Sequence, residues 1–421
     1  MRTKLFLTFI ISTVLALQAS AETIKIRDFE DLCKIGKHPD FPLDGNYELT
    51  GNIDASESRN MNDGKGFEPI GKIVGYTSHG NAILDSAFTG IFDGKGYAIK
   101  GLYIRREQIS DIGLFGYIAD GEIKTLGLKD VSIFGNFRVG SLAGQLKNSK
   151  ITDCYSTGEV HARYDYAGGL VGRSENSTIM NCYSTVNVET RTDYAGGLIG
   201  YLRSGTIMNC YSKGSVVGFT GLGGLVGEIY YAYNSRDVAI TNCYSTGSVS
   251  SIINSVLVGG SIGYSSMDVT NNCFWDTETT KQSTSFGGEG RTTIQMKQQA
   301  TYVGWDFENI WAIEEGQDYP YLQALGKTQT PTFVIKNKIS CNAAAASAPS
   351  ITIRGKTLNI KTSSPTSDLQ IRLFDMRGKT LTRFNTRGSN SFSLSKISAG
   401  RYLVETKENG KRVGTAAVVL R

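Results

Sequence analysis

Hydrophobic and polar positions between residues 88 and 290 follow a repeat of about 28 residues. The repeats align on the last glycine of Gly-Gly-Leu-Val-Gly, with spacings of 28, 28, 28, 27 and 36 residues between Gly116, Gly144, Gly172, Gly200, Gly227 and Gly263. Short apolar alternations are broken by glycine or asparagine, and no 3.6-residue stripe is long enough for a helix. Because such a unit cannot bury its own apolar face, its copies must stack. The pattern predicts an all-β fold, a right-handed parallel β-helix.

Stacking turns equivalent residues into ladders along the solenoid axis. We expect two ladders to point inward, one of isoleucine and one of leucine: Ile151, Ile179, Ile207 and Ile240, and Leu142, Leu170, Leu198 and Leu225. A third set should occupy bends between strands, because Asp and Asn tolerate left-handed backbone and can bond a stacked neighbour: Asp153, Asn181, Asn209, Asn242 and Asn272. The repeat glycines are expected at tight corners.

The segments on either side of the array differ from it in composition. Residues 1–21 have a basic start, an apolar run and small residues before Ala21, which predicts a signal peptide cleaved after Ala21. No later stretch approaches the ~20 apolar residues of a transmembrane segment. We predict an N-terminal capping region (22–87) that contains a short helix capped by Asp28, followed by the β-helix (88–290). A closing segment with two tryptophans (291–326), a linker (327–349) and a small antiparallel β-sandwich (350–421) come after it.

Charge is distributed unevenly along the chain. Residues 351–421 hold 14 Lys and Arg against 4 Asp and Glu, which leaves 30 against 35 in the rest of the chain. The acidic body disfavours a nucleic-acid partner.

Five cysteines occupy one repeat position: Cys154, Cys182, Cys210, Cys243 and Cys273. An earlier copy has Leu126 there, so the position asks for an apolar side chain and an inward packing ladder is favoured. Two alternatives remain for these cysteines. Disulfides could join adjacent coils, since the chain is expected to be exported, or the thiols could bind a metal. Cys33 and Cys341 have no obvious partners.

An aromatic residue follows each of these cysteines, and if the cysteines point inward these rings point outward. The resulting exposed aromatic ladder, with the tryptophan beside its last member, is the predicted binding surface: Tyr155, Tyr183, Tyr211, Tyr244, Phe274 and Trp275. Such a surface could stack on sugar rings or on a protein partner. The alternative is coil-to-coil stacking that only stabilises the solenoid. The inserted loop from Tyr230 to Arg236 is another place where function could reside.

Signs of catalysis are weak in this sequence. The three histidines stand apart, and neither a His-Glu-x-x-His zinc motif nor a Gly-x-Ser-x-Gly elbow paired with histidine is present. Asp165 and Asp193 recur before Tyr-Ala-Gly-Gly, with Glu159 and Glu189 nearby, and are interpreted as solvated turn carboxylates rather than a cation or catalytic site. We therefore expect no enzyme, no catalytic residues, no metal and no cofactor. The alternative, a β-helical polysaccharide lyase or glycoside hydrolase, needs acids that converge across adjacent coils.

Two parts of the chain resemble known families. The segments from Gly168 to Ser184 and from Gly196 to Ser212 resemble the GLUG motif of bacterial surface proteins, among them adhesins and the non-catalytic part of some immunoglobulin A1 proteases. This resemblance implies a β-helical surface stalk or binding region, hence adhesion or binding of a glycan or protein. Segments 369–378 and 394–404 resemble the C-terminal sorting domain of the type IX secretion system. That resemblance implies the secretion machinery as a partner and a secreted or outer-surface location.

Overall fold

The computed structural model describes most of the chain, in two compact units, 1–328 and 329–421. The described residues are 22–72, 75–76, 82–83, 86–230, 238–253, 255–326, 350–354, 357–361, 368–375, 380–387, 390–394, 397, 400–408 and 411–420. The predicted signal peptide and linker, most of the loop after Tyr230, His79 and Cys341 lie outside them.

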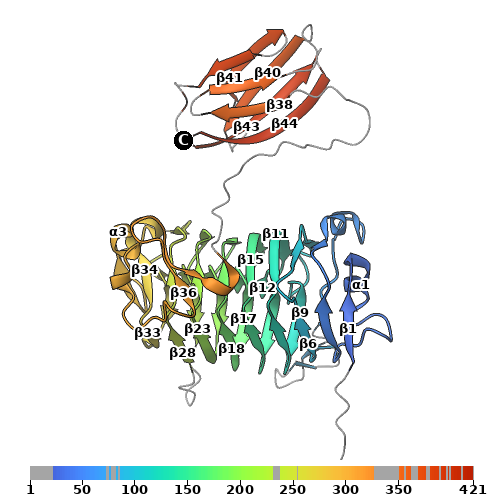
Figure 1. Ribbon diagram of the computed structural model, residues 1–421, viewed down its shortest axis with the longest axis vertical. Helices are drawn as coiled ribbons and strands as arrows, with labels where there is room; N and C mark the ends of the chain where they lie inside the picture. The colour runs from blue at the N-terminus through green and yellow to red at the C-terminus, as the bar shows by residue number, and fades with distance from the viewer. Residues whose placement is uncertain are drawn as a thin grey trace, which may run out of the picture. The chain divides into compact units, whose positions relative to one another are not determined.

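The first unit is a parallel β-helix, and four parallel sheets form the walls of its described part (Figure 1). Each full coil passes in turn through a six-stranded, a nine-stranded, a thirteen-stranded and a five-stranded sheet. Neighbouring strands pair in register one repeat apart, as Ile151 pairs with Ile179 and Ile179 with Ile207. The predicted fold class is confirmed.

The two largest sheets of the described part have nine and thirteen strands. The nine-stranded sheet contains β1 (Thr23–Ile26), β2 (Asn46–Leu49), β6 (Ile91–Asp93), β10 (Glu122–Lys124), β14 (Lys150–Thr152), β18 (Ser177–Met180), β23 (Gly205–Met208), β28 (Val238–Thr241) and β33 (Thr270–Asn271). The thirteen-stranded sheet contains β3 (Ile53–Asp54), β7 (Ala98–Lys100), β8 (Tyr103–Arg105), β11 (Gly127–Gly135), β15 (Tyr155–Ala162), β19 (Tyr183–Ser184), β20 (Asn187–Thr190), β24 (Tyr211–Ser212), β25 (Val216–Gly218), β29 (Tyr244–Ser245), β30 (Val249–Ser251), β34 (Phe274–Asp276) and β35 (Glu289–Arg291).

The two smaller sheets complete each coil. The six-stranded sheet contains β9 (Phe115–Ala119), β13 (Ala143–Lys147), β17 (Val171–Glu175), β22 (Ile199–Leu202), β27 (Val226–Ile229) and β32 (Ile262–Ser265). The five-stranded sheet contains β12 (Val139–Gly140), β16 (Ala167–Gly168), β21 (Ala195–Gly196), β26 (Leu222–Gly223) and β31 (Val258–Gly259). A separate antiparallel pair joins β4 (Gly75–Tyr76) to β5 (Ala82–Ile83).

The inward ladders form the core of the β-helix. The isoleucine, leucine and cysteine ladders are all buried, so the predicted packing role of the cysteines is confirmed. The six cysteines of the described chain are free thiols. Registered neighbours on parallel strands stand about 4.8 Å apart, which is wider than the Cβ separation that a disulfide prefers. The ladder geometry therefore favours packing over bridging.

The asparagine ladder marks one bend of every coil. Asp153, Asn181, Asn209, Asn242 and Asn272 all have positive φ, between 51° and 53°. The Nδ2 of Asn181 donates to Oδ1 of Asp153 at 3.1 Å, and that of Asn209 donates to Oδ1 of Asn181 at 3.2 Å. Both parts of the prediction are confirmed: the left-handed backbone and the bond between stacked neighbours.

The repeat glycines serve a different purpose from the one predicted. They do not have left-handed backbone; instead, a Cβ at Gly172 would lie 2.5 Å from the carbonyl carbon of Arg138. A Cβ at Gly200 would lie 2.6 Å from the carbonyl carbon of Tyr166. The prediction of tight corners is wrong for these glycines, which allow one wall to approach another. The adjacent left-handed corner is formed by Arg138, Tyr166 and Tyr194, with φ of 53°, 69° and 61°.

Helical segments lie at both ends of the β-helix. At the start, Asp28 caps α1 (Phe29–Lys34) by accepting from the backbone N–H of Asp31 at 2.9 Å, as predicted. Strand β1 pairs with β2, and β2 pairs with β6, so residues 22–87 contribute coils as well as a cap. An η1 3-10 turn (Ser56–Asn60) follows β3.

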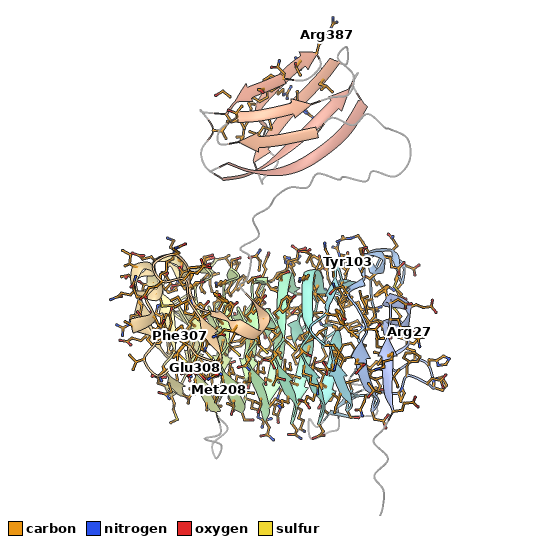
Figure 2. All side chains as sticks on the ribbon, in the orientation of Figure 1. Arg27, Tyr103, Met208, Phe307, Glu308 and Arg387 are labelled. Atoms are coloured by element: carbon orange, nitrogen blue, oxygen red, sulfur yellow. The ribbon has the colours of Figure 1, made fainter. Side chains whose placement is uncertain are left out.

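At the other end, residues 291–326, hereafter the closing segment, pack against the last coils (gold to orange in Figure 1). Just before it, α2 (Thr277–Thr280) follows β34. The segment itself contains α3 (Thr293–Met296), η2 (Gln299–Thr301), η3 (Gln323–Leu325) and the antiparallel pair β36 (Trp311–Ala312) and β37 (Tyr321–Leu322). Phe307 and Glu308 of this segment are labelled in Figure 2.

The second unit has two antiparallel sheets. One contains β38 (Ser350–Arg354), β39 (Thr357–Lys361) and β42 (Asn390–Ser393); the other contains β41 (Thr380–Arg387), β40 (Asp368–Asp375), β43 (Gly400–Glu408) and β44 (Lys411–Leu420). Leucine and isoleucine side chains from both sheets form its core: Leu358, Leu369, Ile371, Leu373 and Leu394. The predicted antiparallel sandwich is confirmed.

Candidate functional site

The predicted aromatic ladder exists as a stack of rings. Tyr155, Tyr183, Tyr211 and Tyr244 have ring centroids 5.0, 4.8 and 5.0 Å apart and interplanar angles of 12°, 9° and 9°. At its first end, the Tyr155 ring packs over Gly127, where a Cβ would lie 2.5 Å from the ring. Each ring therefore covers the face of its neighbour, and the faces are not available to a ligand.

The prediction that this ladder is exposed is wrong. Tyr211 and Tyr244 are fully buried, Tyr183, Phe274 and Trp275 are 4%, 5% and 6% exposed, and only Tyr155 is half-buried. The physical reason is the closing segment, whose Tyr302, Trp305 and Trp311 join the ladder in one apolar cluster. The hydroxyl of Tyr244 donates to the backbone oxygen of Pro320 at 2.6 Å. The ladder binds part of its own chain.

Trp275 belongs to a different row from the other five residues. It pairs in register with Ser245, a member of a buried serine row. Its ring packs against Gly260, where a Cβ would lie 1.9 Å away, and its indole N–H donates to the backbone oxygen of Gln282 at 3.4 Å. Trp275 therefore fills the end of the interior rather than a binding surface.

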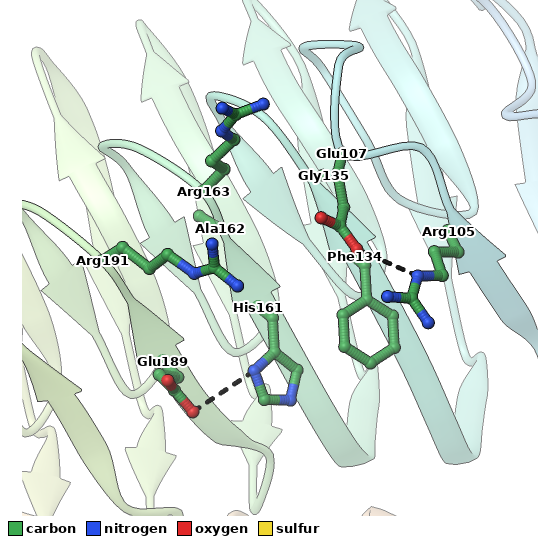
Figure 3. A pocket seen from close by; sticks show the side chains of 9 residues that line it. All are labelled: Arg105, Glu107, Phe134, Gly135, His161, Ala162, Arg163, Glu189 and Arg191. Carbon is green, nitrogen blue, oxygen red and sulfur yellow. Dashed lines mark hydrogen bonds and ion pairs between the residues drawn. The ribbon is translucent and has the colours of Figure 1, made fainter.

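A shallow hollow lies farther along the thirteen-stranded sheet, where no closing segment covers it (Figure 3). Its floor is one outward row across four coils, because Arg105, Phe134, His161 and Glu189 pair in register on β8, β11, β15 and β20. The residues one position earlier on each strand are buried: Ile104, Ile133, Val160 and Val188. Strand alternation thus places the row on the outer face.

Stacking fixes the floor of this hollow, which we call the arginine hollow. The rings of Phe134 and His161 are parallel within 6° at 4.7 Å. The guanidinium of Arg105 lies 5.5 Å from the other face of Phe134 and forms an ion pair with Glu107 at 2.9 Å. With both faces covered, Phe134 presents its edge, which carries the positive part of the ring quadrupole.

His161 lies between two carboxylates of the same face. Its Nδ1 is 3.4 Å from Glu189 and its Nε2 is 3.5 Å from Glu159. Both glutamates are exposed, and so their side chains can also respond to a ligand.

Two more arginines border the arginine hollow, which encloses about 110 Å³. Figure 3 shows Arg163 and Arg191 on the side of His161 and Arg105 beyond Phe134. Within the described chain, neither Arg163 nor Arg191 has a carboxylate within ion-pair distance, whereas Arg105 does. Arg163 only lies over the ring of Tyr164, at 5.5 Å. The hollow therefore has two guanidinium groups that form no ion pair with a described residue, although Glu107 and Glu189 also line it.

The acids singled out by their recurrence lie in two places. Glu159 and Glu189 lie at the arginine hollow, whereas Asp165 and Asp193 lie at the corner that leads to the five-stranded sheet. Asp165 accepts from the Thr192 hydroxyl at 2.6 Å and from the Asp193 N–H at 3.2 Å. Burial, and then the charge of Asp165, raises the pKa of Asp193. These two aspartates are half-buried turn residues and are not fully solvated.

Sequence analysis missed the arginine hollow and a buried glutamate, Glu228. Register spacings of 29, 27 and 28 residues connect Arg105, Phe134, His161 and Glu189, so alignment by strand position could have found the row. The four side chains differ in type, and a search for self-similar residues passes over them.

Comparison with known families identifies two parts of the chain. The family described as the GLUG motif matches residues 164–189 and 192–217, and the family described as the secretion system C-terminal sorting domain matches residues 355–420. Both predicted resemblances are confirmed. The sorting domain implies export by the type IX secretion machinery to the cell surface or outside. In the described residues, no helix has the length and hydrophobicity needed to cross a membrane.

Individual relatives are similar over limited regions. Halomucin of Haloquadratum walsbyi is 36% identical over 103 residues, which are 24% of this chain and 1% of that protein. A candidate Gly-rich membrane protein of Evansella cellulosilytica is 35% identical over 103 residues, 24% of this chain and 11% of the relative. A candidate immunoglobulin A1 protease of Bacteroides ovatus has a similar fold: TM-score 0.53, 21% identity, 72% of this chain and 93% of the other.

Proposed function

We propose that this exported chain is a non-enzymatic surface or released protein that binds an anionic polysaccharide in the arginine hollow. The observation that supports this most is the pair Arg163 and Arg191, neither of which forms an ion pair with a described residue. A guanidinium group can donate two parallel hydrogen bonds to a carboxylate or sulfate. The outward edge of Phe134 adds a weakly positive contact.

The extent of the arginine hollow favours a polymer over a single small anion. Its floor row crosses four coils, and successive strands are about 4.8 Å apart. A chain with repeated acidic groups can contact several coils at once, which multiplies weak contacts through effective concentration. The neighbouring Glu159 and Glu189 would repel densely charged anions, so an intermediate charge density fits best.

Binding of purified mature protein to polysaccharides tests this proposal. Calorimetric titrations would compare polygalacturonate and chondroitin sulfate with neutral dextran. We expect binding of the acidic polymers only, weakened by salt because exposed charges are screened. The double variant R163A/R191A should lose at least about tenfold in affinity, as two charge-assisted contacts are removed. Arg203→Ala, which alters an arginine beside Glu175 on another wall, is the matched control. Equal binding of dextran, or an unaffected double variant, would contradict the proposal.

One observation favours a second function, cleavage of an acidic polysaccharide. A His161 imidazole held between two carboxylates can act as a proton acceptor, and a nearby arginine can neutralise the carboxylate of a sugar acid. Incubation with polygalacturonate, followed by ultraviolet absorbance of unsaturated sugar ends, separates the two functions. No absorbance change is expected from a binding protein. An increase that disappears in His161→Ala would replace the binding proposal with a lyase.

A further inference from the structure

Glu228 is a buried carboxylate to which the described part of the chain supplies no partner. It lies on β27 in the row that follows the repeat glycines, between Tyr201 and Tyr264 in register. Its exposed fraction is 7%, and no described residue donates a hydrogen bond to its carboxylate or forms an ion pair with it. Burial of a carboxylate without compensation is costly, and native proteins mostly avoid it.

Tyrosine rings surround this carboxylate on the outer side of the six-stranded sheet. The left-handed corner residues Tyr166 and Tyr194 stack at 5.6 Å, and Tyr166 meets Tyr201 edge to face at 4.7 Å. In the coil of Glu228 the same corner position is Gly221, where a Cβ would lie 2.4 Å from the Tyr194 ring. The missing side chain lets the Tyr194 ring lean toward that coil.

The charged groups around Glu228 are mainly acidic. Asp165 and Asp193 are the carboxylates whose charges act on it, after the larger effect of burial, and together they raise the pKa of Glu228 to about 7. The cations that act on Tyr166 are already paired: Arg173 with Glu175 at 3.0 Å and Arg138 with Asp111 at 2.5 Å. An incoming cation would therefore find several unbalanced carboxylates.

We propose that Glu228, with the rings of Tyr194 and Tyr201, receives the ammonium group of a lysine side chain from a protein partner. A positive charge would supply the ion pair that no described residue gives Glu228, and it would also be attracted by the Tyr194 ring. The Tyr201 ring already has the guanidinium of Arg173 over it, 5.6 Å from the centroid, so this ring tolerates a neighbouring cation. The slight exposure of Glu228 favours a thin ligand, and lysine carries its charge on a flexible four-carbon stem. A guanidinium is a wider plane, and an amino sugar carries its ammonium directly on a ring. This site is separate from the arginine hollow and does not depend on it.

The titration of Glu228 makes this binding depend on pH. Lysine stays charged near neutral pH, so the ionised fraction of Glu228 decides the affinity. With a pKa of about 7, roughly one tenth of Glu228 is ionised at pH 6 and roughly nine tenths at pH 8. We expect affinity for lysine to rise about tenfold between these values.

The test uses the full mature chain and three probes observed by saturation-transfer NMR. These are acetyl-Gly-Lys-Gly-amide, its norleucine analogue and chitosan tetramer, each at pH 6 and pH 8. The lysine peptide should bind more tightly at pH 8, and the norleucine peptide should not bind. Glu228→Gln, which keeps the shape of the side chain, should lose at least about tenfold in affinity. Glu122→Gln, an acid on the nine-stranded sheet paired with Lys150 at 3.4 Å, is the matched control.

Each outcome decides the proposal. Binding of the lysine peptide but not of the norleucine peptide, together with loss of that binding in Glu228→Gln, supports the proposal. Tighter binding of the chitosan tetramer would overturn lysine as the ligand in favour of an amino sugar. Equal binding by wild type and Glu228→Gln, equal affinity at the two pH values, or no binding of the lysine peptide at millimolar concentration would overturn the site itself.

Discussion

Substituting Glu228 by glutamine should stabilise the protein at alkaline pH. The pKa of this carboxyl is raised from 4.5 to about 7 by burial and then by Asp165 and Asp193. Below pH 4.5 the side chain is protonated in the folded and unfolded states alike. Between pH 4.5 and 7 the unfolded state ionises first, so folding stability falls as pH rises, and above 7 the loss is complete.

The size of the effect follows from that shift. Each pKa unit corresponds to about 1.4 kcal/mol, so a shift from 4.5 to about 7 gives an upper limit of about 3 kcal/mol. Glutamine resembles the protonated acid in shape and never ionises. The variant should therefore match the wild type at pH 4.5 and exceed it by 1 to about 3 kcal/mol at pH 8.

Urea denaturation at pH 4.5 and pH 8, followed by tryptophan fluorescence, measures this difference. All three tryptophans, Trp275, Trp305 and Trp311, lie at the closing end of the β-helix, so the signal reports on this unit. Glu122→Gln serves as the control and should change stability by less than about 0.5 kcal/mol, since its ion pair with Lys150 lies at the surface, with side chains 29% and 50% exposed. A Glu228→Gln variant that is less stable than wild type at pH 8, or equally displaced at both pH values, would refute the reasoning.

Three further substitutions test the structure. Tyr244→Phe removes a buried hydrogen bond to the closing segment and should cost about 1–2 kcal/mol in urea denaturation, with no loss of ring stacking; a cost near zero would argue against that contact. Asp276→Ala removes the cap of α2 and the acceptor of two half-buried hydroxyls, those of Thr293 and Tyr319. It should therefore cost about 3 kcal/mol and speed proteolysis within the closing segment; unchanged proteolysis would count against this role. Gly200→Ala would place a methyl group 2.6 Å from the backbone carbonyl carbon of Tyr166 and should lower stability by about 3 kcal/mol. Gly51→Ala is the control and should be nearly neutral, because no atom lies within 4 Å of the added methyl group. Equal effects of the two substitutions would refute close approach as the reason for the repeat glycines.

The repeat predicted most of the fold because ladders depend only on period. Ile179, Cys182 and Asn209 each belong to a row of equivalent residues, one per coil. Stacking in register gives all members of a row the same environment, so the period alone predicts whether they point inward or lie at a bend. The role of Gly172 could not be predicted in the same way. Glycine suits both left-handed turns and close backbone approach, and only the position of Arg138 decides between them.

The site was harder to predict because it depends on the parts that do not repeat. The period gives the outward direction of Tyr211, but the path of the closing segment that covers it has no period. The arginine hollow and Glu228 are exceptions inside regular rows: His161 follows Phe134, and Glu228 follows Tyr201. A pattern search detects what rows have in common, whereas these sites consist of what differs between coils.

The closing segment also limits how many repeats the β-helix can gain in evolution. Repeat arrays commonly lengthen by duplication of one unit, and each added coil would extend the tyrosine stack by about 4.8 Å. The segment already ends its cover at Tyr155, which is half-buried, while Tyr183 is 4% exposed. One duplicated coil would therefore leave another ring uncovered unless the segment lengthened too. The number of repeats that can be covered is therefore set by the length of the closing segment, and the two must change together in evolution.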